Sequence, residues 1–117
     1  MQSEDKLQAT CFQWANNNYC LKHHKPRLSI FSVPNGGTRN KVEVMTLKST
    51  GLKAGVSDLI ALFPGKAVFF ELKTETGRQS PEQIDFQTVV EALGFEYHLI
   101  RSFDQFKKTF AQLAKNA

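Results

Sequence analysis

The feature of this sequence that most constrains its fold is a pair of β-forming runs joined by Pro64-Gly65. The runs are VSDLIALF (56–63) and KAVFFELKT (66–74), and both are rich in β-branched and aromatic residues. A Pro-Gly pair between two such runs is a signal for a two-residue turn. The segment therefore predicts a β-hairpin.

Three charged residues, Asp58, Glu71 and Lys73, interrupt these apolar runs. They need an explanation, because burying an unpaired charge costs several kcal/mol. With Pro64 and Gly65 in the turn, Asp58 lies opposite Glu71 on the neighbouring strand. Since side chains alternate along a strand, Lys73 points to the same face as Glu71. The register therefore predicts two carboxylates and an amine close together.

Two carboxylates held this close repel each other unless a cation lies between them or one of them is protonated. Mg²⁺ suits such a pair, because it takes hard oxygen ligands, often one or two carboxylates, and keeps several waters. The nearby lysine would then orient or deprotonate a water, or stabilise negative charge on a phosphate under attack. A buried ion pair among the same three residues needs no metal, and the pattern alone leaves both interpretations open.

The remaining sequence predicts further helices and strands around the hairpin. Ser80, Pro81 and Gln83 have the pattern of a helix start with a capping box. Helical spacing or turn signals predict helices at 3–21, 40–51, 80–94 and 103–115, and strands at 27–34 and 95–102. The predicted order is α-β-α-β-β-α-β-α, an α/β arrangement, and the length suits a single domain over residues 1–117.

The charge balance is compatible with a polyanionic partner. Lys and Arg number 15 against 11 Asp and Glu, which gives a formal net charge of +4. Basic residues gather in LKHHKPR (21–27) and are scattered through the predicted loops, where a solvated surface is an equally good explanation for each. Together with carboxylates able to hold a metal, they favour nucleic acid. We expect DNA contacts from loop residues, namely Asn35, Arg39, Lys53 and Arg78.

Other classes of protein fit the sequence less well. No apolar run approaches the roughly 20 residues of a membrane span, and the N-terminal MQSEDKLQ does not resemble a signal peptide. We therefore expect a cytoplasmic protein without membrane association. Cys11 and Cys20 are expected to be reduced, packed thiols. The pair His23-His24 has no partner at zinc spacing and is expected to belong to a basic loop.

Several segments together resemble a known family. GVSDL, followed by FFELKTETGRQSPEQIDF and LGFEYHLIRS, is similar to the VRR-NUC domain of the PD-(D/E)XK nuclease superfamily, particularly its stand-alone versions from phages and bacteria. PNGGTRN and LKSTGLKAG match the same pattern. The resemblance implies a restriction-endonuclease-like αβββαβ core with a mixed central sheet flanked by helices. It also implies a Mg²⁺-dependent DNA endonuclease, with Mn²⁺ as a substitute and with branched DNA such as a Holliday junction among its substrates.

The resemblance assigns roles to the residues of the hairpin. Asp58 and Glu71 would be metal ligands, and the backbone carbonyl of Leu72 would be a third. Lys73 would be the catalytic lysine. Ser57 stands where the superfamily name has a proline, but that proline is no ligand, so the departure changes little.

Two helical residues are implicated in the same way. Gln83 matches a glutamine that the family places near the site, although a glutamine here would also serve purely as a helix cap. Many members of the superfamily carry a glutamate on the first helix that approaches the metal, and Glu4 is the candidate in this chain. Glu4 and Asp5 would equally stabilise the helix dipole as first-turn acids.

Two other functions are compatible with these residues. One is a DNA-binding module on the same fold whose acidic site does not turn over, and the other is a structural domain with a buried ion pair that binds no divalent ion. For the nuclease, we expect a homodimer, because cutting two strands with single-site subunits needs two copies and identical subunits tend to pair by two-fold symmetry.

Overall fold

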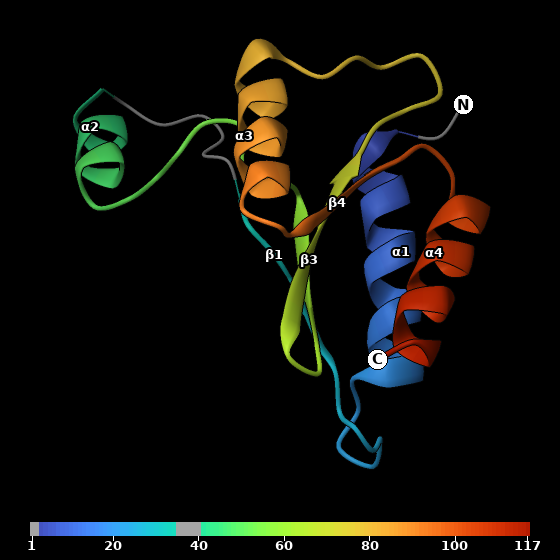
Figure 1. Cartoon of the computed structure of the whole chain (residues 1–117). Coiled ribbons are helices and arrows are strands. Elements are labelled where there is room, and N and C mark those ends of the chain that lie inside the picture. The colour runs from blue at the N-terminus through green and yellow to red at the C-terminus, as the bar shows by residue number, and fades with distance from the viewer. Residues whose placement is uncertain (1–2, 35–40) are drawn as a thin grey trace.

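The computed structural model describes residues 3–34 and 41–117. Within these residues the chain forms helices and strands in the predicted order (Figure 1). They are α1 (Glu4–Tyr19), β1 (Ser29–Ser32), α2 (Lys41–Ser49), β2 (Leu59–Phe63), β3 (Lys66–Leu72), α3 (Pro81–Ala92), β4 (Glu96–Ile100) and α4 (Phe103–Lys115). The predicted bounds are close for the helices, whereas β1 is shorter than its predicted range.

The strands form one sheet in the order β1-β2-β3-β4. β1, β2 and β3 are antiparallel neighbours, whereas β4 runs parallel to β3 because α3 carries the chain back between them. The hairpin has the predicted register, with Phe63 opposite Lys66 and Leu59 opposite Phe70. The mixed sheet expected from the resemblance is therefore confirmed.

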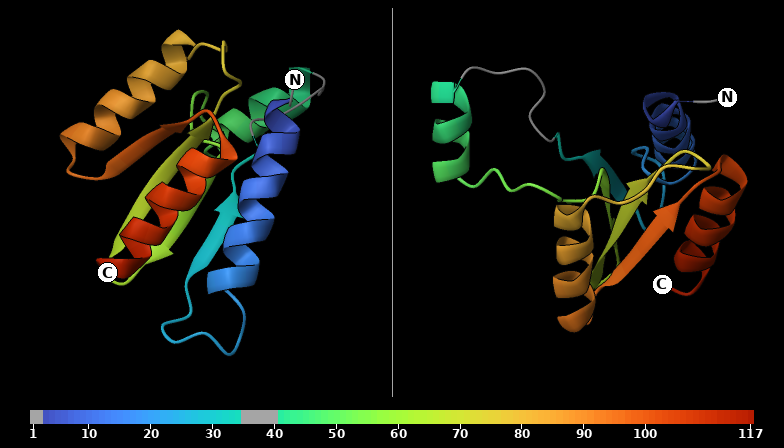
Figure 2. Two further views of the ribbon diagram at one scale, coloured as in Figure 1. Left: turned by 90° about the vertical axis from the view of Figure 1, so that its right-hand side faces the viewer. Right: turned by 90° about the horizontal axis from the view of Figure 1, so that it is seen from above.

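Helices cover both faces of this sheet. α1 and α4 lie side by side on one face, α3 lies on the other, and α2 stands apart from the sheet (Figures 1 and 2). α1 turns a stripe of small and apolar residues inward, made of Leu7, Cys11 and Ala15. This arrangement leaves the β3–α3 connection, with the acidic end of the hairpin, at one end of the sheet.

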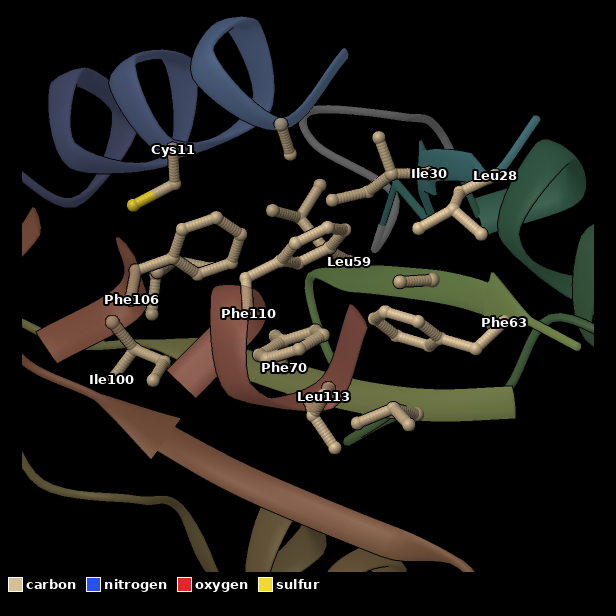
Figure 3. Packing of buried hydrophobic residues seen from close by; sticks show 14 of the residues in the cluster. Cys11, Leu28, Ile30, Leu59, Phe63, Phe70, Ile100, Phe106, Phe110 and Leu113 are labelled. Atoms are coloured by element: carbon tan, nitrogen blue, oxygen red, sulfur yellow. The ribbon is translucent and has the colours of Figure 1, made fainter. Parts of the chain in front are cut away.

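The hydrophobic core lies between the sheet and the α1–α4 layer (Figure 3). Its centre is aromatic: the Phe70 ring lies 5.2 Å from that of Phe106 and 6.1 Å from that of Phe110. Cys11 and Cys20 are buried free thiols, as predicted. Replacing one of these phenylalanines with alanine would cost about 3–5 kcal/mol, so this side of the sheet provides a rigid base for the residues on the opposite face.

The α3 layer is thinner than the α1–α4 layer. Phe86 packs edge-on against Phe69 of β3 at 5.7 Å, and Val90 is buried. Ile84 and Leu93, two further apolar residues of the helix predicted at 80–94, are 51% and 69% exposed. A single helix on this face buries one stripe and leaves its flanks in solvent.

Candidate active site and metal centre

Two acidic residues meet where the hairpin ends. Asp58 directly precedes β2, and its Oδ2 atom accepts a hydrogen bond of 2.8 Å from the backbone N–H of Leu72. Continuing the observed register by one step sets Asp58 opposite Glu71. The two-residue turn therefore brings together the carboxylates that the sequence predicts to be close.

Glu71 is the most deeply buried charged residue of this group, with 1% of its surface exposed. Its Oε2 atom accepts a hydrogen bond of 3.0 Å from Gln83 Nε2, whereas Oε1 is buried and accepts none from the residues the structure describes. Burial, reinforced by the negative charge of Asp58 and partly offset by Lys73, raises the pKa of Glu71 to about 8. Without a cation, the ionised form of this carboxyl is therefore disfavoured.

Lys73 follows β3 and remains fixed to the sheet. Its backbone N–H donates a hydrogen bond of 2.9 Å to the Ile100 carbonyl, which extends the β3–β4 ladder by one step. The side chain is largely buried, and Nζ lies 4.0 Å from Glu71 Oε2 and 3.9 Å from Glu4 Oε1. The amine is thus held between two carboxylates contributed by different elements.

Gln83 connects the helix start with the acidic pair. Its backbone N–H donates to Ser80 Oγ and its side-chain Oε1 accepts from the Ser80 backbone N–H at 2.8 Å, so the predicted capping box is present. The Nε2 atom of the same side chain donates to Glu71. The two sequence interpretations of Gln83, a cap and a residue near the site, are therefore both satisfied at once.

Glu4 extends the site toward α1. It lies in the first turn of the helix, with its side chain 44% exposed, and reaches Lys73. Gly77 lies close to it, since a Cβ atom on Gly77 would be 3.6 Å from Glu4 Oε2. Glu4 is linked to the acidic pair through Lys73, and its position in the first turn also suits the helix dipole.

Gly55 is not among the predicted site residues, yet it sets the position of α3. Gly55 has a φ of +87°, and a Cβ atom built on it would lie 2.2 Å from the Glu82 carbonyl oxygen and 2.9 Å from Gln83 N. The segment before Asp58 therefore touches the backbone of the first turn of α3 directly. The sequence shows only a glycine in a loop. That this glycine packs against the backbone of α3 is visible only in the fold.

A cluster of polar side chains that the sequence does not predict lies beneath α3. Gln79 Nε2 donates to Gln87 Oε1 at 2.9 Å and to the Tyr97 hydroxyl at 3.3 Å. Burial first, and then the negative charge of Glu71, raise the pKa of the Tyr97 hydroxyl well above its usual value. Tyr97 is therefore a neutral phenol that anchors the segment leading into α3.

The donors at this site fit a hard divalent cation such as Mg²⁺. Within the described residues there is no cluster of three or more His, Cys, Asp or Glu side chains placed to hold a metal. Mg²⁺ does not need such a cluster, because one or two carboxylates and several waters suffice. The unpartnered Oε1 of Glu71 is a buried acceptor of the required type next to Asp58. Asp58 and Glu71 are therefore the residues that would hold the ion.

The expected DNA-binding residues are only partly placed by the structure. Lys53 and Arg78 are exposed, and they lie shortly before Gly55 and Ser80, respectively, so both flank the first turn of α3. Asn35 and Arg39 lie outside the described residues. Among the described residues, no helix has the length and apolar character needed to span a bilayer.

Comparison with solved structures identifies the fold. A chain described as "VRR_NUC domain protein" matches with a TM-score of 0.78 and 20% sequence identity, over 98% of this chain and 90% of that one. The chain has the VRR_NUC fold. Protein-family models and curated proteins, in contrast, gave no match to the sequence. The resemblance noted in the sequence is thus confirmed at the level of the fold. In this chain Asp58, Glu71, Lys73 and Gln83 lie together at one end of the sheet.

Proposed function

We propose that this chain is a metal-dependent DNA endonuclease of the VRR-NUC family. The observation that carries the proposal is the environment of Glu71, a buried carboxyl with one unpartnered oxygen, an acidic neighbour in Asp58 and an amine 4.0 Å away. An apolar pair of residues would have served a purely structural role at lower cost in desolvation. A site prepared to receive a cation explains why the fold retains these groups.

Each residue would have a distinct task in phosphodiester hydrolysis. Asp58 and Glu71 would hold Mg²⁺, or Mn²⁺ in its place, with the Leu72 carbonyl as a further oxygen donor. The ion would supply a Lewis acid at the scissile phosphate and lower the pKa of a bound water. Lys73 would stabilise the negative charge that develops on the phosphate or help to deprotonate the attacking water. Gln83 would hold the Glu71 carboxylate in a fixed orientation.

The decisive test compares Glu71→Gln with the parent. Because burial already disfavours the ionised form of Glu71 without metal, the amide should preserve the fold and still accept the hydrogen bond from Gln83. It should lose Mg²⁺ binding, measured by calorimetry, and Mg²⁺-dependent cleavage of linear and branched DNA. Asp58→Ala should have the same effect on cleavage with DNA binding retained, and Asp85→Ala, on the exposed side of α3, is the control.

The same assay separates the nuclease from its alternatives. A catalytically inactive DNA-binding module would bind the DNA panel and cleave none of it with Mg²⁺ or Mn²⁺. A domain with a buried ion pair would bind neither DNA nor metal. Full cleavage by Asp58→Ala or Glu71→Gln would show that the chemistry lies elsewhere.

We further propose that the substrate is double-stranded or branched DNA and that the active form is a homodimer in the cytoplasm of a bacterium, encoded by the host or a phage. Lys53 and Arg78 flank the start of α3 and would contact phosphates, together with Asn35 and Arg39. Two sites in one assembly would cut both strands of a junction. Sedimentation of the protein alone and with a four-way junction would test both points. Failure to bind the junction would contradict the proposed substrate, and a monomer on the junction would contradict the homodimer.

A further inference from the structure

The turn that follows Lys73 forms one wall of the site. It runs from Thr74 to Gly77 and is closed by a hydrogen bond of 3.2 Å from Gly77 N to the Thr74 carbonyl. A Cβ atom on Gly77 would lie 2.9 Å from Thr74 Oγ1 and 3.6 Å from Glu4 Oε2. The turn is therefore compact and lies next to Glu4, whose Oε1 atom is 3.9 Å from Lys73 Nζ. Any movement of the turn would move the Lys73 side chain or its partner.

Arg101 binds the inner side of this turn. It is the first residue after β4, and its Nη1 atom donates to the carbonyls of Thr74 at 2.8 Å, Gly77 at 2.7 Å and, more weakly, Glu75 at 3.3 Å. These carbonyls converge on one nitrogen of a charged guanidinium, and charge-assisted hydrogen bonds of this type are stronger than neutral ones. The Thr74–Gly77 turn is thereby tied to the end of β4.

The base of this contact is also fixed. The Arg101 backbone N–H donates to Gln105 Oε1 at 2.8 Å, and Gln105 Nε2 donates to the Leu99 carbonyl at 2.9 Å. Gln105 belongs to the first turn of α4, where its backbone N–H is capped by Ser102 Oγ. Arg101 is thus held by the β4–α4 junction and itself holds the turn beside the active site.

We propose that Arg101 is a positioning residue, which holds the Thr74–Gly77 turn so that Lys73 stays against Glu71 and Glu4. Its effect on cleavage rests on the proposed nuclease function, whereas its effect on the turn does not. A lysine would replace it only in part, because its side chain is shorter than that of arginine and its ammonium would not reach all the carbonyls that converge on Nη1.

The test compares Arg101→Ala and Arg101→Lys with Arg27→Ala as a matched control. Arg27 also donates from its guanidinium to a backbone carbonyl, that of Cys20 at 2.9 Å. It lies beyond the opposite end of α1 from Glu4, about 24 Å away at 1.5 Å per residue over the 16 residues of the helix. Removing it tests the loss of an arginine–carbonyl contact far from the site.

Two readouts are measured on each variant: Mg²⁺-dependent cleavage at saturating DNA, and amide hydrogen exchange along the chain. In Arg101→Ala, kcat should fall about 10- to 100-fold with KM nearly unchanged, as expected when a catalytic group is misplaced by about 1 Å. Exchange should rise in residues 74–80 and stay at the parent level in β2. Arg101→Lys should recover part of kcat. Arg27→Ala should match the parent in kcat and in the exchange of residues 74–80.

Parent-like exchange at residues 74–80 in Arg101→Ala would overturn the proposal, and so would parent-like kcat in a protein that cleaves DNA. Exchange raised uniformly across the sheet would overturn it too, because it would show a general loss of stability. A parent protein that cleaves no DNA would refute the nuclease function, and locally raised exchange in Arg101→Ala would then still support the role of Arg101 in holding the turn.

Discussion

The close approach of Gly55 to α3 gives a prediction whose size can be worked out from the structure. In Gly55→Ala the new Cβ atom would lie 2.2 Å from the Glu82 carbonyl oxygen, whereas a carbon and a carbonyl oxygen in contact lie about 3.3–3.6 Å apart. The first turn of α3 must therefore move by roughly 1 Å. Because Gln83 Nε2 is 3.0 Å from Glu71, this movement takes that hydrogen bond beyond its useful range.

Several energetic terms add up in this variant. Alanine at a φ of +87° costs roughly 1–2 kcal/mol, and a stiffer unfolded chain returns about 0.4–1 kcal/mol of that. Overpacking costs about 1–3 kcal/mol, and the lost hydrogen bond about 0.5–1.5 kcal/mol. We expect a decrease of about 2–6 kcal/mol in the free energy of unfolding, together with a loss of roughly 100-fold in cleavage from the displaced Gln83.

Gly94→Ala is the matched control, because Gly94 has a φ of +90° and no described atom within 4 Å of its Cβ position. It should lose about 1 kcal/mol through backbone strain alone and keep parent activity. Urea unfolding gives the stabilities, and Mg²⁺-dependent cleavage well below the unfolding midpoint gives the rates. Equal stability and equal activity in the two variants would refute the reasoning, since the contact with α3 would then have no effect.

Three further perturbations test the electrostatics of the site. Lys73→Met should keep the fold and metal binding but lose most turnover, because the apolar stem is retained without the charge; a loss of about 3–5 kcal/mol in unfolding free energy would instead indicate a structural ion pair. Because folding raises the pKa of Glu71, the protonated carboxyl contributes stability to the metal-free protein. This contribution is fully present below about pH 4.5 and is lost as the pH rises through about 8. In EDTA, the parent should therefore lose stability relative to Glu71→Gln across this window, by at most about 1.4 kcal/mol per pH unit. Saturating Mg²⁺ should abolish this trend, because the ion binds the ionised carboxylate. An unfolding free energy of the parent that rises with pH relative to Glu71→Gln in EDTA would contradict this. DNA affinity should fall steeply with salt concentration, as measured by fluorescence anisotropy, and an affinity independent of salt would argue against phosphate contacts.

The hairpin shows how far the sequence alone could lead. A two-residue turn at Pro64-Gly65 leaves no freedom in the register, so the pairing of Leu59 with Phe70 and the approach of Asp58 to Glu71 follow by counting. The start of α3 was equally accessible, because the Ser-Pro-x-Gln pattern is local. In both places the interactions join residues whose spacing is set by a single element or turn.

The interactions that escaped the sequence analysis join residues across the fold. Arg101 contacts carbonyls of the Thr74–Gly77 turn, and backbone carbonyls carry no sequence signal. Gly55 could be recognised as a loop glycine, but its contact with α3 depends on how the sheet positions that helix. The exposure of Leu93 also depends on the absence of a second helix beside α3 among the described residues. Periodicity indicates which residues can face a core, and the packing decides which of them do.

The double use of Gln83 makes one side chain the common support of a helix and of Glu71, the proposed metal ligand. Its oxygen is engaged by the Ser80 backbone and its nitrogen by Glu71, so the residue must present an acceptor and a donor at the same time. Gln83→Glu could retain the cap but would offer Glu71 a second acceptor in place of a donor. When the first turn of α3 frays, Glu71 consequently loses its hydrogen bond from Gln83 at the same time. Activity should therefore decline on warming together with local opening at residues 80–83, before the sheet itself unfolds.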